Sequence, residues 1–258
     1  MAALSESSLP GVWRASDLAT ADLCTLASGH GELDEQLPGG GWPHGQLSEI
    51  LQAQAGLHEW RLLLPALRQA VKTGTLVLIG LPHLPNLPAL ACQGIPAARV
   101  LRVEARTPAE RLWSAEQVLR CRDLAALLVW LPQARPEQLR RLQLASQSSN
   151  TAQSQPLAFV FRPIAAQMES SPAPLRLSLA GGTRHGLEVQ ILKRRGPALD
   201  TPLQLQAALP VVVALRASQR DAVLTPPSAG LIEVVNHAVD RTRPIERHRS
   251  DIRQPAHA

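Results

Sequence analysis

The chain has 258 residues, of which 45% are hydrophobic and 18% are charged. This composition is ordinary for a globular protein, so it argues against wholesale disorder or a fibrous repeat, and the length suffices for one sizeable core. The longest uninterrupted apolar run, Leu124 to Leu131, is far shorter than the ~20 residues that span a bilayer, and the first residues lack a signal-like pattern. We therefore expect a soluble cytoplasmic protein with no membrane association.

Basic residues outnumber acidic ones by 26 to 21, and only Lys72 and Lys193 are lysines. The charge is uneven along the chain: residues 1 to 60 hold one basic and eight acidic residues, and residues 61 to 258 hold 25 and 13. A GC-rich coding bias explains an excess of arginine. Alternatively, arginine serves to contact phosphates or acidic partners, because guanidinium stays charged and binds oxyanions through two N–H groups.

Cysteine and histidine give no sign of a metal site. Cys24, Cys92 and Cys121 are widely separated and match neither a zinc-ligand spacing nor an even disulfide framework. We expect them to be buried free thiols in a reducing compartment. The histidines are scattered, so the sequence supports neither a metal site nor a histidine-centred catalytic triad, and no cofactor is expected.

The first half of the chain alternates short apolar runs with helical patterns. The predicted strands are Gln46 to Leu51, Thr75 to Ile79 and Ala98 to Val103, and the predicted helices are Leu57 to Lys72 and Asn86 to Gln93. Pro65 is expected either to kink the first of these helices or to mark its first regular turn. A further helix begins after Thr107, which is followed by proline at the first helical position and by glutamate at the third, and runs to about Arg122. This spacing predicts a capping box.

The second half continues the alternation, with strands Ala125 to Leu131 and Pro156 to Phe161 around a helix, Pro136 to Ser146. Such a series is typical of an α/β protein with a mostly parallel sheet flanked by helices. Leu175 to Leu179 and Leu187 to Lys193 then flank a glycine-rich turn, which predicts an antiparallel hairpin at one sheet edge. Beyond Pro197 the periodicity weakens to a candidate strand, Pro210 to Arg216, a short candidate helix, Leu231 to Val239, and an arginine-rich tail expected to be mobile.

The segment from Ser28 to Leu51 has turn glycines, a proline and an acid expected to be buried in one specific register. The matching positions are Leu33, Asp34, Leu37, Gly40, Gly41, Pro43, Gly45, Glu49 and Ile50. In this register it resembles the leader of the ATPase core in the RecA recombinase family. The resemblance implies an N-terminal segment over residues 1–27, a RecA-like core over 28–196 and a C-terminal region over 197–258 that contains the tail.

In that family a phosphate-binding loop, G-x-x-x-x-G-K-[ST], follows the leader. Here Gln52 and Leu57 stand for the two glycines, His58 for the lysine and Glu59 for the hydroxyl residue, and Gly56 supplies a glycine only after a one-residue shift. A glutamate at the start of the next helix is expected to repel a triphosphate. Two other family residues are also missing. Pro82 stands near the position of the catalytic glutamate, and Trp130 stands at the position of the metal-holding aspartate. The nucleotide site is therefore degenerate, and we expect no ATPase activity.

The most specific stretches are Gly39 to Pro43 and the helix Leu62 to Leu67, with Val12 to Arg14 upstream. They are similar to the translesion DNA synthesis-associated ImuA family, a RecA-like and SulA-like group, over about residues 10 to 195. The resemblance implies a non-catalytic accessory factor in SOS-induced mutagenic translesion synthesis and DNA damage tolerance. Its implied partners are an ImuB-type Y-family polymerase homologue, an error-prone replicative-type polymerase and a RecA-type recombinase.

Two other functions remain open on the sequence. One is a DNA-stimulated ATPase with a non-standard site built from His58, Glu59 and nearby arginines. The other is a SulA-like inhibitor that binds a cell-division polymer, because the ImuA family is SulA-like as well as RecA-like.

Two regions match the DNA-facing loops of RecA-like proteins, Arg135 to Gln155 and Ala165 to Arg176. The candidate phosphate contacts in and near them are Arg135, Arg140, Arg141, Arg184, Lys193, Arg194 and Arg195. Since aromatic residues for base stacking are missing there, the pattern predicts weak, sequence-independent and salt-sensitive DNA binding. The alternative is an ordinary solvated face on an arginine-rich protein.

Candidate partner-binding residues lie elsewhere in the chain. Trp42, in a glycine-rich turn, either closes the vacated nucleotide pocket or docks a partner, and Trp13 either docks another subunit or folds back onto the core. The tail arginines either bind an acidic partner surface or only make the chain soluble; they are Arg241, Arg243, Arg247, Arg249 and Arg253.

Overall fold

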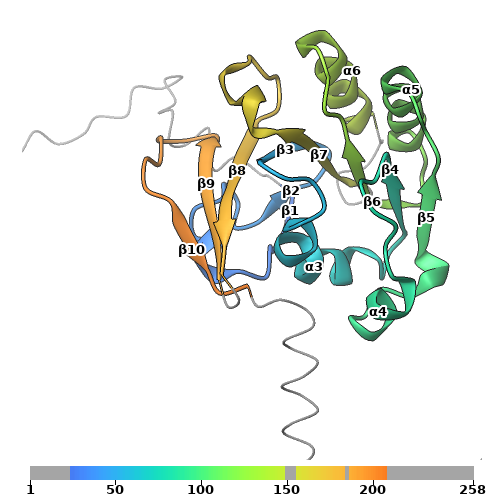
Figure 1. Cartoon of the computed structure of the whole chain (residues 1–258), viewed down its shortest axis with the longest axis horizontal. Coiled ribbons are helices and arrows are strands. Elements are labelled where there is room, and N and C mark those ends of the chain that lie inside the picture. Colours follow the sequence, from blue (N-terminus) through green and yellow to red (C-terminus); the bar gives the residue numbers. More distant parts are fainter. Residues whose placement is uncertain (1–23, 149–154, 184–185, 208–258) are drawn as a thin grey trace, which may run out of the picture. The chain divides into compact units, whose positions relative to one another are not determined.

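The computed structural model describes residues 24–148, 155–183 and 186–207 (Figure 1), all within the first of the two units into which the chain divides, Met1–Ser218. Several predictions lie outside the described residues: Trp13, Arg184, the candidate strand Pro210 to Arg216, the candidate helix Leu231 to Val239 and the arginine-rich tail.

A sheet of eight strands in the order β10-β9-β8-β3-β7-β6-β4-β5 forms the centre of this unit (Figure 1). The strands from β8 to β5 run parallel, and β9 and β10 run antiparallel beside β8. Their bounds are β3 Leu47–Gln52, β4 Thr75–Ile79, β5 Val100–Val103, β6 Leu124–Trp130, β7 Leu157–Pro163, β8 Leu175–Gly182, β9 Leu187–Lys193 and β10 Leu203–Leu205. The predicted α/β class, mostly parallel sheet and antiparallel hairpin are confirmed.

Two features extend beyond the predicted core. β10 pairs with β9, so the sheet continues past the predicted hairpin and past Gly196. A separate two-stranded antiparallel sheet joins β1 (Thr25–Leu26) to β2 (Trp42–Pro43), with the short helix α2 (Gly31–Asp34) between them. This pairing closes residues 27–41, the first part of the leader, into a loop just before β3.

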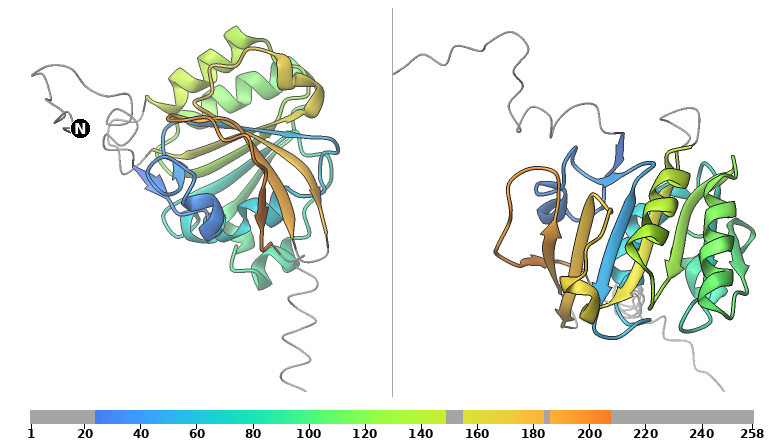
Figure 2. Two further views of the ribbon diagram at one scale, coloured as in Figure 1. Left: turned by 90° about the vertical axis from the view of Figure 1, so that its left-hand side faces the viewer. Right: turned by 90° about the horizontal axis from the view of Figure 1, so that it is seen from above.

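Helices cover both faces of the sheet (Figure 2). Alternate residues of a strand belong to the clusters on opposite faces. On β4, Leu76 and Leu78 pack in the same cluster as α3 (Glu59–Ala70) and α4 (Leu87–Cys92). Val77 and Ile79 pack with α5 (Pro108–Leu119) and α6 (Pro136–Ser146). This alternation explains the continuously apolar strands, because a strand buried on both faces has no solvent-facing side. Short 3-10 turns, η1 (Ala97–Arg99) and η3 (Ile164–Met168), precede β5 and follow β7.

Local predictions hold at most helix ends. The capping box of α5 is formed, with Glu110 N donating to Thr107 Oγ1 (3.2 Å) and Thr107 N donating to the Glu110 carboxylate (3.1 Å). Backbone donors of Thr107 and Arg106 lower the pKa of Glu110. At Pro65 the helix α3 continues without a break, so the proline lies inside the helix rather than at its start.

The cysteine prediction is half wrong. The three cysteines are free thiols, but all three are exposed instead of buried. Cys92 ends α4 and Cys121 follows α5, where the side chains leave the packed helix face. None of the helices in the described ranges is long and apolar enough to cross a membrane.

Candidate functional site

The loop that joins β3 to α3 follows a strand that lies between β7 and β8 in the sheet. In open α/β sheets, ligands bind outside the carboxyl ends of the strands, at the point where strand order reverses. Here β3 leads through Gln52 into the loop, and α3 begins at Glu59. This strand, loop and helix form the unit that holds a phosphate in nucleotide-binding proteins.

The Glu59 carboxylate lies inside this loop and accepts four hydrogen bonds. Oε1 accepts from Gln52 Nε2 (2.7 Å), Gly56 N (2.5 Å) and Trp130 Nε1 (3.0 Å), and Oε2 accepts from His58 N (3.0 Å). The residue is 1% exposed. Four of the residues that define the degenerate site are thus brought together around the fifth.

These donors are of the kind that bind phosphate, namely backbone amides at a helix start together with polar side chains. A carboxylate of the chain already satisfies them, so the loop is a closed anion site with an internal occupant. Gly56 has a φ of +88°, and a Cβ there would lie 2.5 Å from the His83 ring, so the turn requires glycine. The sequence predicted that Glu59 would repel a phosphate; the structure adds that the carboxylate occupies the donors itself.

His58, at the position of the phosphate-binding lysine, is a poor cation. Burial and the nearby Arg61 lower the pKa of its imidazole, and Glu59 only partly opposes them. Its Nδ1 is buried without a hydrogen-bond partner in the described part of the chain. The ring is therefore neutral near pH 7 and supplies no fixed positive charge.

Arg61 is turned away from the loop and ties α3 to the antiparallel edge. Its Nε donates to Ala207 O (3.0 Å), and its Nη2 donates to Thr183 O (2.9 Å) and Gly186 O (2.8 Å). The residue is 5% exposed, and its hydrogen bonds hold the hairpin turn and the chain after β10. Its charge disfavours protonation of His58, but its donors are engaged by these carbonyls and do not point to the loop amides.

A cleft of about 490 Å³ opens beside the loop, at the carboxyl ends of β3, β4, β6 and β7. Gln52, Pro82 and Trp130 line it, so three of the predicted positions converge on one cleft. Trp130 stacks on Phe161 with ring centroids 4.6 Å apart. Leu57 is exposed and does not line the cleft.

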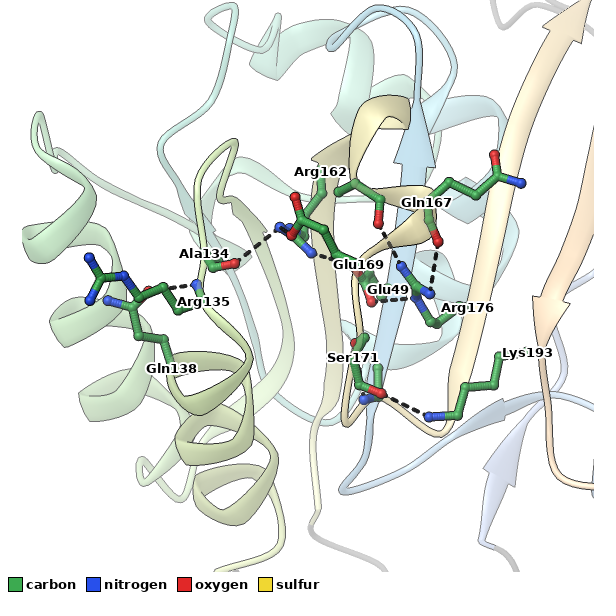
Figure 3. A network of polar contacts seen from close by, with 12 residues as sticks. Glu49, Ala134, Arg135, Gln138, Arg162, Gln167, Glu169, Ser171, Arg176 and Lys193 are labelled. Atoms are coloured by element: carbon green, nitrogen blue, oxygen red, sulfur yellow. Dashed lines mark hydrogen bonds and ion pairs between the residues drawn. The ribbon is translucent and has the colours of Figure 1, made fainter.

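A buried ion cluster fixes the opposite face of the central strands (Figure 3). Glu49 on β3 accepts from Arg162 Nη1 on β7 (3.0 Å) and from Arg176 Nε on β8 (2.8 Å), and all three side chains are almost fully buried. Arg162 Nη2 also donates to Ala134 O (3.0 Å) and to the half-exposed Glu169 (2.6 Å). The cluster thus joins three strands to the segments that follow β6 and β7, which are the two regions predicted to face DNA.

The predicted phosphate contacts do not form one surface. Arg135, Arg140 and Arg141 are exposed at the start of α6 and along it, at the carboxyl end of β6, and Arg141 pairs with Glu116. Lys193 ends the antiparallel β9, beside Arg176 near the start of β8, and Arg194 and Arg195 follow it, so this group lies toward the opposite end of the parallel strands.

The second group is also partly engaged in internal bonds. Lys193 Nζ donates to Ser171 O (2.9 Å), and Arg194 bonds the Gln36 backbone oxygen. Burial and Arg176 lower the pKa of Lys193. Arg195 is exposed. A nucleic acid would therefore meet two separate groups of cations.

The expectation that Trp42 docks a partner or closes the vacated pocket is wrong. Its side chain is 0% exposed and packs edge-to-face on Phe159, with ring centroids 5.1 Å apart. It does not line the cleft. The turn that carries it is held in the small antiparallel sheet, because β2 pairs with β1 over Trp42–Pro43.

Among the described residues, no group of three or more His, Cys, Asp or Glu side chains is arranged to hold a metal ion. Comparison with known proteins does not identify the chain: no protein-family model matches it, and no curated protein matches it.

Proposed function

We propose that this protein is a non-catalytic RecA-like accessory or adaptor protein in SOS-induced mutagenic translesion synthesis and DNA damage tolerance. The observation that carries the non-catalytic part is the Glu59 carboxylate on the donors of the β3–α3 loop. The specific pathway rests on the resemblance of the leader and of the α3 sequence to the ImuA family. In this role the protein acts by binding an ImuB-type polymerase homologue, an error-prone replicative-type polymerase and a RecA-type recombinase.

Three features of the loop support the absence of nucleotide hydrolysis. The anion donors are occupied by Glu59, and His58 is a neutral ring in the place of a lysine. Trp130, in the place of a metal-holding carboxylate, donates to Glu59 and packs on Phe161. Phosphoryl transfer relies on positioning and on charge stabilisation by cations, and this loop provides neither.

Two features support a RecA-like core. The strand that follows the matched leader is β3, which lies centrally in a mostly parallel sheet and leads into the loop and α3. The acid of the matched leader, Glu49, is buried in an ion cluster, as the resemblance implies for a buried acid in that register.

Calorimetry with Mg²⁺ and ATP tests the non-catalytic assignment. We expect no stoichiometric heat signal at protein concentrations that give a clear isotherm for a recombinase with an intact phosphate loop. We also expect no phosphate release with or without single-stranded DNA, which separates the adaptor from a DNA-stimulated ATPase. A one-to-one isotherm or measurable turnover would show that the loop opens and that the proposal is wrong.

Pull-down of the full chain against each of the three implied partners tests the adaptor role. The tail is probed by Arg→Gln changes at Arg243, Arg247, Arg249 and Arg253, and a matched variant changes four exposed arginines of the core, Arg68, Arg99, Arg120 and Arg122. If the tail docks an acidic surface, only the tail variant loses capture, by at least about tenfold. Failure of the unaltered chain to bind any of the three proteins contradicts the proposed role.

A further inference from the structure

The cleft beside the loop continues into a second hollow. The first, of about 490 Å³, and the second, of about 500 Å³, share the lining residues Gly80, Leu81 and Arg111. The second lies along the end of β5 and includes Val103 and the 73% exposed Leu84. Together they form one groove along the carboxyl ends of the parallel strands.

The groove is apolar at one end and positively charged toward the other. Trp130, Phe161 and Pro163 line the first hollow. The charged residues that line the two hollows are four arginines and one glutamate. The arginines are Arg102, Arg106, Arg111 and Arg162, and the glutamate is Glu104. Arg162 is neutralised by Glu49, and Arg102 pairs with Glu104, which leaves the middle of the groove electropositive.

Arg111 lies where the two hollows meet. Its Nε donates to Ala105 O (3.1 Å) and its Nη1 to Trp130 O (3.3 Å), and among the described residues no carboxylate forms an ion pair with it. A guanidinium fixed by two carbonyls and only half-buried presents its remaining N–H groups in a set direction. Such a group is suited to bind a carboxylate through charge-assisted hydrogen bonds.

A second observation also indicates a ligand. Gln52 lines the first hollow, is 3% exposed, and donates its Nε2 to Glu59, while its Oε1 is buried with no partner in the described part of the chain. A buried acceptor without a donor is costly, and such groups often mark where a ligand binds. A backbone or side-chain N–H entering the hollow would satisfy it.

We propose that this groove binds an extended segment of a protein partner, with an apolar side chain against Leu81, Pro82 and Pro163 in the first hollow followed by acidic residues at Arg111. The inference rests on the proposed adaptor function, in which the cleft holds no nucleotide. The length of the groove favours an extended peptide, because the two hollows are joined end to end. A nucleotide lacks the phosphate donors it needs there, since Glu59 occupies them.

The test uses the full chain and a fluorescein-labelled peptide, acetyl-Leu-Phe-Gly-Asp-Asp-amide, with binding followed by fluorescence anisotropy. We expect saturable one-to-one binding. Changing both peptide aspartates to asparagine should weaken binding by about tenfold, as should Arg111→Gln, because each removes the same charge pair. Arg99→Gln, an exposed arginine outside the groove, should bind as the unaltered chain does.

A second variant leaves the Arg111 hydrogen bonds intact. Ala53 is exposed and lines the first hollow, so Ala53→Trp fills the groove without removing a core side chain, and it should abolish peptide binding. No binding by the unaltered chain, or equal affinities for Arg111→Gln and Arg99→Gln, overturns the groove while leaving the adaptor function intact. Competition by Mg²⁺-ATP would instead overturn the proposed function, because the cleft would then be a nucleotide site.

Discussion

Glu59 is the residue on which the closed loop depends. Replacing it by alanine leaves the donors from Gln52, Gly56, His58 and Trp130 without their acceptor in a buried site. We expect Glu59→Ala to lower the free energy of unfolding by about 3 kcal/mol, since unsatisfied buried donors carry the full cost of desolvation. Urea denaturation followed by circular dichroism measures this change.

Two matched variants make that measurement specific. Glu59→Gln keeps an acceptor oxygen and the side-chain volume, so it should lose roughly half as much stability as the alanine variant. Glu137→Gln changes an exposed glutamate at the start of α6 and should alter stability by less than about 0.5 kcal/mol. An alanine variant as stable as the unaltered chain would mean that the four hydrogen bonds contribute nothing.

His58 should make stability depend on pH in the weakly acidic range. Burial and Arg61 lower its pKa in the folded state below the ordinary value of 6.5, so the unfolded chain binds a proton first as pH falls. The free energy of unfolding should therefore fall as the pH drops below about 6.5, until the folded-state pKa is reached. His58→Gln should flatten this part of the profile, measured by urea denaturation across a pH series. A rise in stability on acidification that depends on His58 would contradict the assignment.

The buried cluster on β7, β3 and β8 is what joins the central strands on the α6 face. Removing Glu49 leaves Arg162 and Arg176 as buried cations without their shared carboxylate. We expect Glu49→Ala to cost about 4 kcal/mol in urea denaturation, because breaking a buried ion pair strands its partner.

Glu169 is the natural comparison within the same cluster. Its side chain is half-exposed, so solvent screens its pair with Arg162, and Glu169→Gln should cost less than about 1 kcal/mol. Glu104→Gln, which breaks a surface pair with Arg102, should cost still less. Equal losses for Glu49 and Glu169 would show that burial does not set the strength of the cluster.

The elements were predictable where local pattern decides them. β4 and α6 have the predicted bounds, because a short apolar run rich in β-branched residues and a proline at the first helical position are local signals. The predicted burial of the cysteines was wrong, since the burial of a side chain depends on how its segment packs against the rest of the fold. The sequence also could not predict that the Glu59 carboxylate is buried among four donors, because one of them, Trp130, lies 71 residues away along the chain.

Contacts between residues far apart in the chain also could not be predicted from the sequence. The leader register indicated that Glu49 is buried, but its partners are 113 and 127 residues further on, and only the strand order places them beside it. Arg111 carried no motif at all. Its place in the groove follows from the packing of α5 against β6, and no spacing in the sequence records that contact.

At the scale of the molecule, the candidate phosphate contacts in the described part of the chain are divided between two ends of the sheet. We expect binding to an oligo-dT 30-mer to be weak and to weaken as salt is raised, with each lost phosphate contact reducing the slope of log K against log salt by about 0.7. Arg135→Gln with Arg140→Gln tests one end, and Lys193→Gln with Arg195→Gln tests the other. Fluorescence anisotropy across a salt series should show a reduced slope for one pair only. A salt-independent affinity would contradict phosphate binding altogether.

An occupant that belongs to the polypeptide cannot dissociate. For a protein that binds a free ligand, the population of the liganded state follows the ligand concentration and its dissociation constant. Glu59 removes that dependence, because the anion arrives with the chain and is present in every folded molecule. In the proposed non-catalytic role, the loop has no empty and filled states between which to alternate, and so no means of timing assembly and release. In the proposed role, the amount of protein made, rather than the energy state of the cell, would set how much of it is active.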